Sequence, residues 1–153
     1  MPRIDTRLEQ LGIALPEPAA PVASYVPYVE HAGMLTVSGQ ISFGADGLVT
    51  GRLGDELSLE DGIAAARLCG LMLLAQARAA LGDLDRVERV VRLGGFVASA
   101  PHFTDQPKVV NGASDLMLDV FGEAGRHARA AVGAAALPLG ASVEVEGLFA
   151  VRS

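Results

Sequence analysis

The feature that most constrains the fold is an apolar repeat between Ser58 and Gly82. Apolar side chains recur there at helical spacing, namely Ile63, Leu68, Leu71, Met72, Ala75 and Ala79. Serine favours the N-cap of a helix, acidic residues follow in the first turn, and glycine is a common residue just past the end. We therefore predict a long amphipathic helix over residues 59–81.

A second helix and several strands follow from the same kind of pattern. Another apolar stripe comprises Val109, Val110, Ala113, Leu116, Met117, Val120 and Phe121, and it predicts a helix over residues 108–123. Residues 87–98, 128–136 and 142–152 read as strands, the last with alternating valine and glutamate. Residues 34–42 are predicted to form a hairpin with residues 48–50, across a turn at Gly44 to Gly47.

The order of these elements predicts an α+β fold. One mixed sheet would carry two helices on a single face, and the opposite face would need cover, so we expect the protomer to form oligomers. The first 15 residues can form a short amphipathic turn or helix through Ile4, Leu8 and Leu11, and the prolines of residues 16–21 predict an extended connector. At 153 residues the chain has the usual size of one domain, so we assign residues 1–153 to a single domain.

Composition narrows the classes of partner. The formal net charge is -6, which on average repels nucleic acid and anionic membrane surfaces. The single cysteine, Cys69, lies in an apolar helical stretch, so a small buried thiol in a reducing cytoplasm is expected. The apolar tract at residues 68–80 contains Arg78 and is too short to span a bilayer, and no secretion signal is recognisable, so we expect a cytoplasmic protein.

One arginine stands out as a candidate for chemistry. Arg129 lies among small apolar residues, ahead of a proline turn and a strand that carries Glu144 and Glu146. A charge removed from water needs a partner, so Arg129 forms either an ion pair with one of these glutamates or a site for an external anion. His31, His102 and His127 are scattered and are expected to be surface or loop residues, so the sequence predicts neither a metal site nor a cofactor.

Several motifs resemble those of the Rid family, also called YjgF/YER057c/UK114 and endoribonuclease L-PSP. Residues 129–151 (RAAVGAAALPLGASVEVEGLFAV) are similar to the family's C-terminal signature of an arginine, a Leu-Pro turn and a Val-Glu-hydrophobic-Glu strand. Residues 34–41 (MLTVSGQI) resemble its Ser-Gly-Gln strand. The resemblance covers residues 25–151 and leaves residues 1–24 as an N-terminal extension. It implies a fold like that of bacterial chorismate mutase, with a six-stranded sheet, two helices and clefts between the subunits of a homotrimer.

The resemblance also implies an activity and a set of site residues. Deaminase members hydrolyse 2-imino acids to 2-oxo acids and ammonia, which makes a small carboxylate metabolite the expected partner. By position, Arg129 would bind the carboxylate and Glu144 would activate water. The matching substrate-binding positions are Tyr25, Ser38, Gly39, Asn111 and Ala131.

Alternatives remain at several of these positions. Tyr28 rivals Tyr25, either tyrosine can be a packing residue, Glu144 can instead hold Arg129 in place, and Asn111 can be a helix N-cap. Ala131 stands where deaminase members often carry cysteine, which with the extension indicates a divergent subgroup. For the protein as a whole, the alternatives are an endoribonuclease or translation inhibitor and a non-catalytic module that binds small carboxylates.

Overall fold

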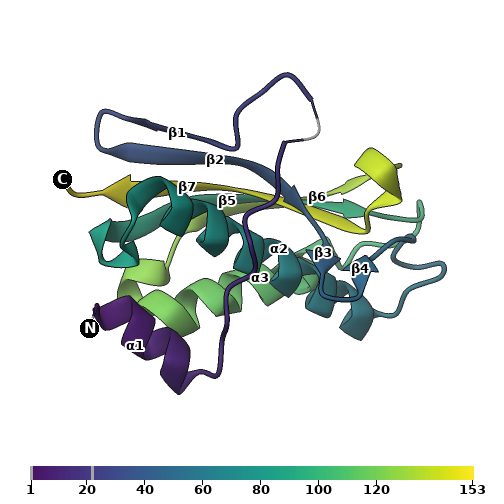
Figure 1. The fold of residues 1–153 in the computed structure, drawn as a ribbon. Coiled ribbons are helices and arrows are strands. Elements are labelled where there is room, and N and C mark those ends of the chain that lie inside the picture. The colour runs from purple at the N-terminus through teal and green to yellow at the C-terminus, as the bar shows by residue number, and fades with distance from the viewer. Residues whose placement is uncertain (1, 22) are drawn as a thin grey trace.

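The computed structural model describes residues 2–21 and 23–153. A mixed sheet forms one layer, and two long helices pack together on one of its faces (Figure 1). The strand order is β1-β2-β7-β5-β6, and only the β5–β6 pair is parallel. The predicted α+β class with a mixed sheet and two helices on a single face is confirmed.

The first long helix, α2, spans Leu59–Leu81 as predicted. Its N-terminus has a capping box, in which the Ser58 hydroxyl accepts from the Asp61 amide and the Asp61 carboxylate accepts from the Ser58 amide. α2 is long and apolar enough to cross a membrane by length and composition, but 56% of its apolar window is buried inside the protein. The tract is thus longer than the sequence indicated, and its burial is typical of a core helix.

The hairpin prediction was wrong in its pairing. β2 (Met34–Ile41) pairs with the preceding segment, β1 (Tyr28–His31), rather than with residues 48–50. The chain reverses at Ala32 and Gly33, whose φ angles are 54° and 76°, the left-handed conformation that two-residue hairpin turns require. Residues 43–44 (β3, Phe43–Gly44) and 47–48 (β4, Gly47–Leu48) form a separate small ladder.

A β-α-β unit supplies the other edge of the sheet. β5 spans Val87–Ala98, α3 spans Gln106–Phe121 and β6 spans Ala128–Ala134, parallel to β5. Pro107 lies in the first turn of α3, where its missing N–H is no loss, so the helix begins two residues earlier than predicted. β7 (Val143–Val151) then inserts antiparallel between β2 and β5. Among the described residues the main sheet therefore has five strands rather than the expected six, since β3 and β4 stand apart.

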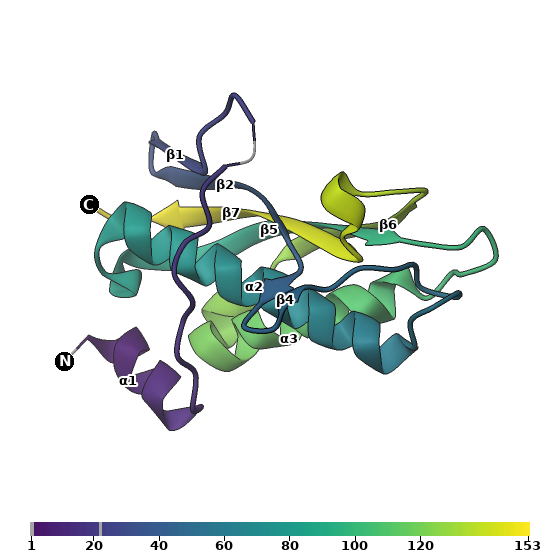
Figure 2. The ribbon, with the colours of Figure 1, turned by 45° about the vertical axis from the view of Figure 1, so that its right-hand side comes forward.

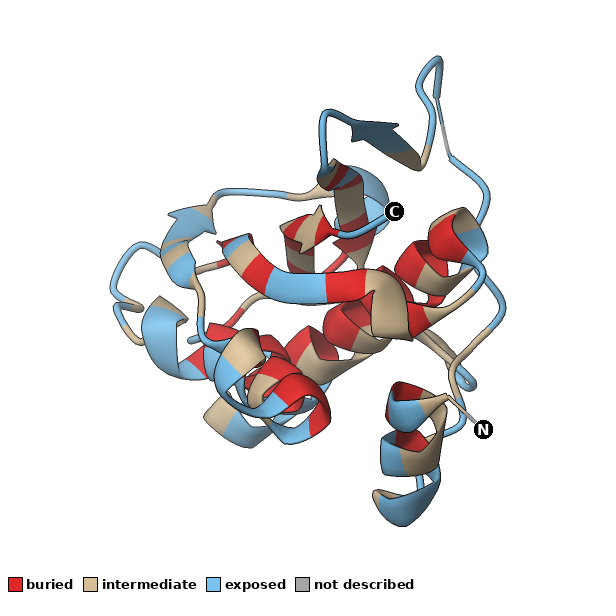
Figure 3. Ribbon diagram, turned by 90° about the vertical axis from the view of Figure 1, so that its left-hand side faces the viewer, coloured by how far each residue is buried: buried red, intermediate tan, exposed pale blue. Residues whose placement is uncertain are grey.

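The sheet has a buried face and an open face. Side chains toward the helices are buried, including Leu35, Leu93, Val143, Val145 and Phe149, and they pack with one side of α2 and α3 (Figure 3). Strand residues alternate between faces, so Arg92, Glu144, Glu146 and Leu148 point the other way. Figure 1 shows no α-helix of the described residues over that open face.

The N-terminal residues pack onto the helix layer. α1 (Arg3–Gln10) buries Ile4 and Leu8, as its predicted apolar positions require. The Asp85 carboxylate accepts from the backbone amides of Arg3 and Ile4, at 2.7 and 2.8 Å, and so caps α1 from a distance. Residues 13–21, the strap, run without helix or strand from α1 past α2 toward the β1 end of the sheet (Figure 2).

Candidate functional site

Arg129 lies on β6 and points to the helix side of the sheet. It is in register with Leu93 of β5, a core residue with no exposed surface, and residues directly opposite in a ladder share a face. The guanidinium reaches α3, where Nη1 donates to Asn111 Oδ1 at 2.8 Å and to Ser114 Oγ at 3.1 Å. Nη2 donates to the Pro107 carbonyl at 3.2 Å.

These partners of Arg129 are all neutral. None of the ion pairs between described residues includes Arg129, and the side chain is only partly buried. A guanidinium has five N–H donors, so two of them, Nε–H included, have no partner among the described residues. The arginine is therefore held in one orientation while its charge remains uncompensated.

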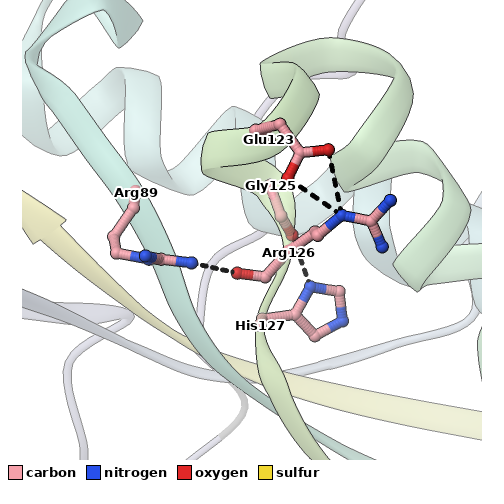
Figure 4. A network of polar contacts seen from close by, with 5 residues as sticks. All are labelled: Arg89, Glu123, Gly125, Arg126 and His127. Atoms are coloured by element: carbon pink, nitrogen blue, oxygen red, sulfur yellow. Dashed lines mark hydrogen bonds and ion pairs between the residues drawn. The ribbon is translucent and has the colours of Figure 1, made fainter.

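A histidine completes this cluster of side chains. His127 Nδ1 lies 2.6 Å from the Gly125 carbonyl, which can only accept, so Nδ1 carries the proton (Figure 4). In the neutral ring Nε2 then accepts from the Ser114 hydroxyl at 2.9 Å, which leaves a Ser114 lone pair for Arg129. We call Arg129, Asn111, Ser114 and His127 the Arg129 cluster.

The turn before β6 is held by further contacts, which are visible in Figure 4. Arg126 Nε lies 3.1 Å from both carboxylate oxygens of Glu123, and Arg89 Nη2 donates to the Arg126 carbonyl at 2.7 Å. These bonds join the short 3₁₀ turn at Gly122–Gly125 to β5 and fix the start of β6. They therefore fix the direction in which the side chains of His127 and Arg129 extend toward α3.

Glu144 belongs to a different place, a pocket of about 590 Å³ between α2, β2 and the start of β7. We call it the Glu144 pocket. Its walls are mostly apolar, with polar groups contributed by Tyr25, Gln40 and Glu144. The lining residues are Ala19, Ala20, Pro21, Ala23, Tyr25, Pro27, Gly39, Gln40, Ile41, Phe43, Met72, Pro138, Leu139 and Glu144.

The carboxylate of Glu144 has an unusual environment. Burial raises its pKa above the ordinary carboxyl range, and the neighbouring Glu146 carboxylate adds to the rise. Glu146 itself is paired with Arg92 at 3.4 Å, whereas the described residues offer Glu144 no ion pair. A carboxylate with a raised pKa in a mostly apolar pocket is a suitable proton acceptor.

Close contact with β2 restricts the position of Glu144. A Cβ built on Gly39 would lie 2.9 Å from Glu144 Cδ, closer than real Cβ atoms approach a neighbour. Only glycine therefore leaves room for the carboxylate where it stands. The β2 ladder shifts register between Val37 and Gln40, and this bulge brings Gly39 against Glu144.

The two tyrosines have different positions. Tyr25 lines the Glu144 pocket and is 44% exposed, whereas Tyr28 is in β1 and packs against the core. Ser38 fixes the segment that carries Tyr25, since its hydroxyl donates to the Val26 carbonyl at 2.7 Å and its amide to the Pro27 carbonyl at 2.9 Å. Ser38 is thus placed to hold the pocket wall.

Arg129 and Glu144 lie on opposite faces of the sheet in one protomer, although the Glu144 pocket extends past β2 as far as Met72 of α2. Glu144 is in register with Phe96 and Arg129 with Leu93, on either side of β5. Their Cα atoms are roughly 14 Å apart, given a strand spacing of about 4.8 Å and a rise of about 3.3 Å per residue. No ion pair forms between Arg129 and either Glu144 or Glu146, so that alternative for Arg129 was wrong.

Other site predictions need correction. Asn111 lies inside α3, whose N-cap is Asp105, so it does not cap the helix. Ala131 pairs with Gly95 and lies on the same face of β6 as Arg129, so its predicted part in substrate binding beside Arg129 stays a prediction. Ser114 and His127 were missed, although the sequence held a signal for each. Ser114 follows Asn111 by three residues, which places both on one face of a helix. His127 precedes Arg129 by two residues, which places both on one face of an extended chain.

Comparison with known proteins gives a consistent assignment. The family model described as YjgF/chorismate mutase-like, putative endoribonuclease, matches residues 5–151. Protein TCP17 of Trypanosoma cruzi is 55% identical over 153 residues, which covers 99% of this chain and 96% of that protein.

Two solved structures show how the fold relates to the family. The Agrobacterium tumefaciens protein Atu1372 is 46% identical, with a TM-score of 0.90 over 97% of this chain and 92% of that one. RidA from an Antarctic Psychrobacter species is 28% identical, with a TM-score of 0.60 over 88% of this chain and 94% of that one. The backbone thus follows Atu1372 more closely than RidA, and the chain belongs to the YjgF/chorismate mutase-like family, the Rid family of the sequence motifs.

Proposed function

We propose that the protein is a deaminase that hydrolyses 2-imino or enamine carboxylic acids to 2-oxo acids and ammonia, in a site shared by two copies of the chain. The observation that carries this proposal is the state of Arg129. Its guanidinium is oriented by neutral acceptors on α3, faces no carboxylate among the described residues, and retains two unpartnered N–H groups. Such a group is prepared for an anion from outside the protomer.

The chemistry of the anchor favours a carboxylate. A guanidinium can donate two parallel charge-assisted hydrogen bonds to a carboxylate, a geometry that lysine cannot reproduce. Asn111 and Ser114 occupy both N–H groups of Nη1 and the Pro107 carbonyl occupies one of Nη2, so Nε–H and the second N–H of Nη2 are the donors left for such a pair. The carboxylate of the substrate would then set the position of its imine carbon.

Glu144 is proposed to act on the water. As a general base it takes a proton from water while the water oxygen bonds to the imine carbon, and the imine nitrogen takes a proton from solvent. The proton held by Glu144 then passes to the nitrogen of the resulting carbinolamine, the C–N bond breaks to release ammonia, and the carbinolamine hydroxyl returns its proton to solvent as the carbonyl of the 2-oxo acid forms. The raised pKa of Glu144 brings its basicity closer to neutral pH, where general-base catalysis is most effective. The reaction as written uses water as its co-substrate.

The separation of the two groups is the reason for a shared site. Within one protomer a small imino acid cannot contact Arg129 and Glu144 together, because the sheet lies between them. The open face of the sheet carries exposed apolar side chains, including Val29 and Val132, which a second copy would cover. We propose a homotrimer in which each cleft combines the Arg129 cluster of one subunit with the Glu144 pocket of its neighbour.

The test is release of 2-oxo acid from imines generated in situ by an amino-acid oxidase. We expect the parent protein to accelerate release, and Arg129→Ala to remove the acceleration. Arg129→Lys is the matched control because it keeps the charge without the bidentate geometry, so it should remain strongly impaired. Equal rates with parent and Arg129→Ala would contradict the proposal.

A second candidate is an endoribonuclease, which the description of the family model favours. The net charge of -6 and the two glutamates of β7, Glu144 and Glu146, weigh against it, since phosphate binding normally needs basic surface. RNA cleavage by the purified parent that Glu144→Gln abolishes would favour this candidate. Carboxylate binding at Arg129 without turnover of any imine or RNA would instead indicate a non-catalytic binding module.

A further inference from the structure

The Glu144 pocket is larger and more apolar than a short imino acid needs. Apart from Tyr25, Gln40 and Glu144, every lining residue is alanine, glycine, proline or a larger apolar residue. Its volume of about 590 Å³ falls within the range of pockets that enclose ligands well beyond three or four carbons. A substrate that only reached Glu144 would leave most of this apolar wall in contact with water.

The strap makes the outer wall of the pocket. β1 ends its pairing with β2 at Val37, so residues 38–41 of β2 continue beyond the edge strand. Ala19, Ala20 and Pro21 of the strap line the pocket alongside this stretch, which pairs with β7 on its other side. The extension that precedes the family motifs thus contributes directly to the cavity beside Glu144.

A buried amide fixes the strap in this position. Gln76 is 1% exposed on α2, and its Nε2 donates to the Ala19 carbonyl at 2.7 Å and to Gln40 Oε1 at 3.4 Å. Gln40 in turn donates from Nε2 to the Ser38 carbonyl at 2.9 Å. A buried glutamine in an apolar helix is costly unless hydrogen-bonded, and here its bonds join the strap, α2 and β2.

We propose that the strap and the apolar wall form a side-chain subsite, so that the protein prefers imino acids with a large branched or aromatic side chain. This inference rests on the proposed deaminase function for the position of the imine carbon beside Glu144. The side chain would extend from that carbon toward Met72, Phe43 and Leu139. One methylene in a hydrophobic pocket changes specificity by about tenfold or more, so several together exceed that ratio.

The experiment compares kcat/KM for imines made from alanine, leucine and phenylalanine in the parent and in two variants. We expect the leucine or phenylalanine imine to exceed the alanine imine by about tenfold or more. Ala20→Phe fills the pocket from the strap and should reduce this ratio by about tenfold. Ala14→Phe is the matched control, because Ala14 is an exposed strap residue outside the pocket lining, and it should leave the ratio unchanged.

Two outcomes would overturn the inference, and a binding measurement separates it from the proposed function. Equal kcat/KM for alanine and phenylalanine imines in the parent contradicts it, as does an equal loss for all imines in Ala20→Phe. If the parent hydrolyses no imine, the deaminase proposal fails, and calorimetry with 4-methyl-2-oxopentanoate and 2-oxopropanoate decides the subsite. Tighter binding of the larger acid, lost in Ala20→Phe, supports the subsite, and equal or undetectable binding of both refutes it.

Discussion

Two inactive variants should restore activity when their subunits mix. Arg129→Ala removes the carboxylate anchor and Glu144→Gln removes the proposed base, while each variant keeps the other half of the site. If each site joins Arg129 of one subunit to Glu144 of its neighbour, a mixed assembly contains sites in which both residues are native. A site within one protomer gives no such recovery.

The expected activities follow from the hydrogen bonds between Arg129 and the substrate carboxylate, and from the fraction of sites in a mixed assembly that have both residues native. Two charge-assisted bonds to Arg129 contribute about 3 kcal/mol, so Arg129→Ala alone should lose a factor on the order of 100. Loss of a general base also costs a factor on the order of 100 or more. With random mixing of equal amounts, each half of a site is native with even probability, so about a quarter of the parent activity should return.

Co-expression of the two variants, each with a different affinity tag, allows mixed assemblies to be isolated before their activity is measured. Tandem purification removes unmixed assemblies, and each mixed closed trimer then has one native site, about a third of the parent activity per assembly. A dimer treated in the same way would return about half, so the value also reports the assembly. Two copies of Glu144→Gln with different tags are the control. Mixed assemblies no more active than the single variants would refute the shared site.

Four further predictions follow from individual contacts. Gly39→Ala should lower kcat by about tenfold or more with little change in stability, because the new Cβ displaces the flexible end of Glu144; kinetics and thermal melting check this. Glu144→Gln should stabilise the fold at neutral pH, because burial raises the pKa of Glu144 and its ionisation therefore opposes folding. Urea titrations should show that this gain in the free energy of unfolding vanishes below the ordinary carboxyl pKa. Asp85→Asn should cost about 1 kcal/mol at neutral pH. Burial opposes ionisation of Asp85, but the amides of Arg3 and Ile4 lower its pKa overall. Urea titrations should therefore show the stability difference between parent and Asp85→Asn fade as the pH falls through this lowered pKa. His127→Leu should weaken carboxylate binding at Arg129 more than His127→Gln does, because glutamine can still accept from Ser114; calorimetry with benzoate compares them.

The sequence predicted the elements whose pattern is decided by burial. α2 and β5 have the predicted bounds, because a helix or strand with one side in the core must repeat apolar residues at a fixed period. The predicted pairing of residues 34–42 with residues 48–50 was wrong for a local reason. The turn before β2 is Ala32–Gly33, and alanine is uncommon at a positive φ, so the signal was weaker than that of the glycines at 44 and 47.

The site residues were predicted by resemblance, and their separation was not. Arg129 and Asn111 belong to the Arg129 cluster, whereas Tyr25, Gly39 and Glu144 line the Glu144 pocket. His127 was expected to be a surface or loop residue, and no motif singled out Ser114. Their importance depends on a contact between α3 and β6 that no local pattern encodes.

The sequence does not show which residues of β6 face the helices and which face the open side of the sheet. On β7 the buried valines at 143 and 145 fix Glu144 on the open face, so that half of the geometry is implicit in the sequence. β6 offers no such signal, because its residues are alanine, glycine and one valine besides Arg129, and small residues fit either face. A one-residue shift of β6 would place Arg129 on the same face as Glu144 and allow a site within one protomer. The contacts of Arg129 with α3 fix the register that places it on the face opposite Glu144, and the proposed sharing of a site between two copies depends on that placement.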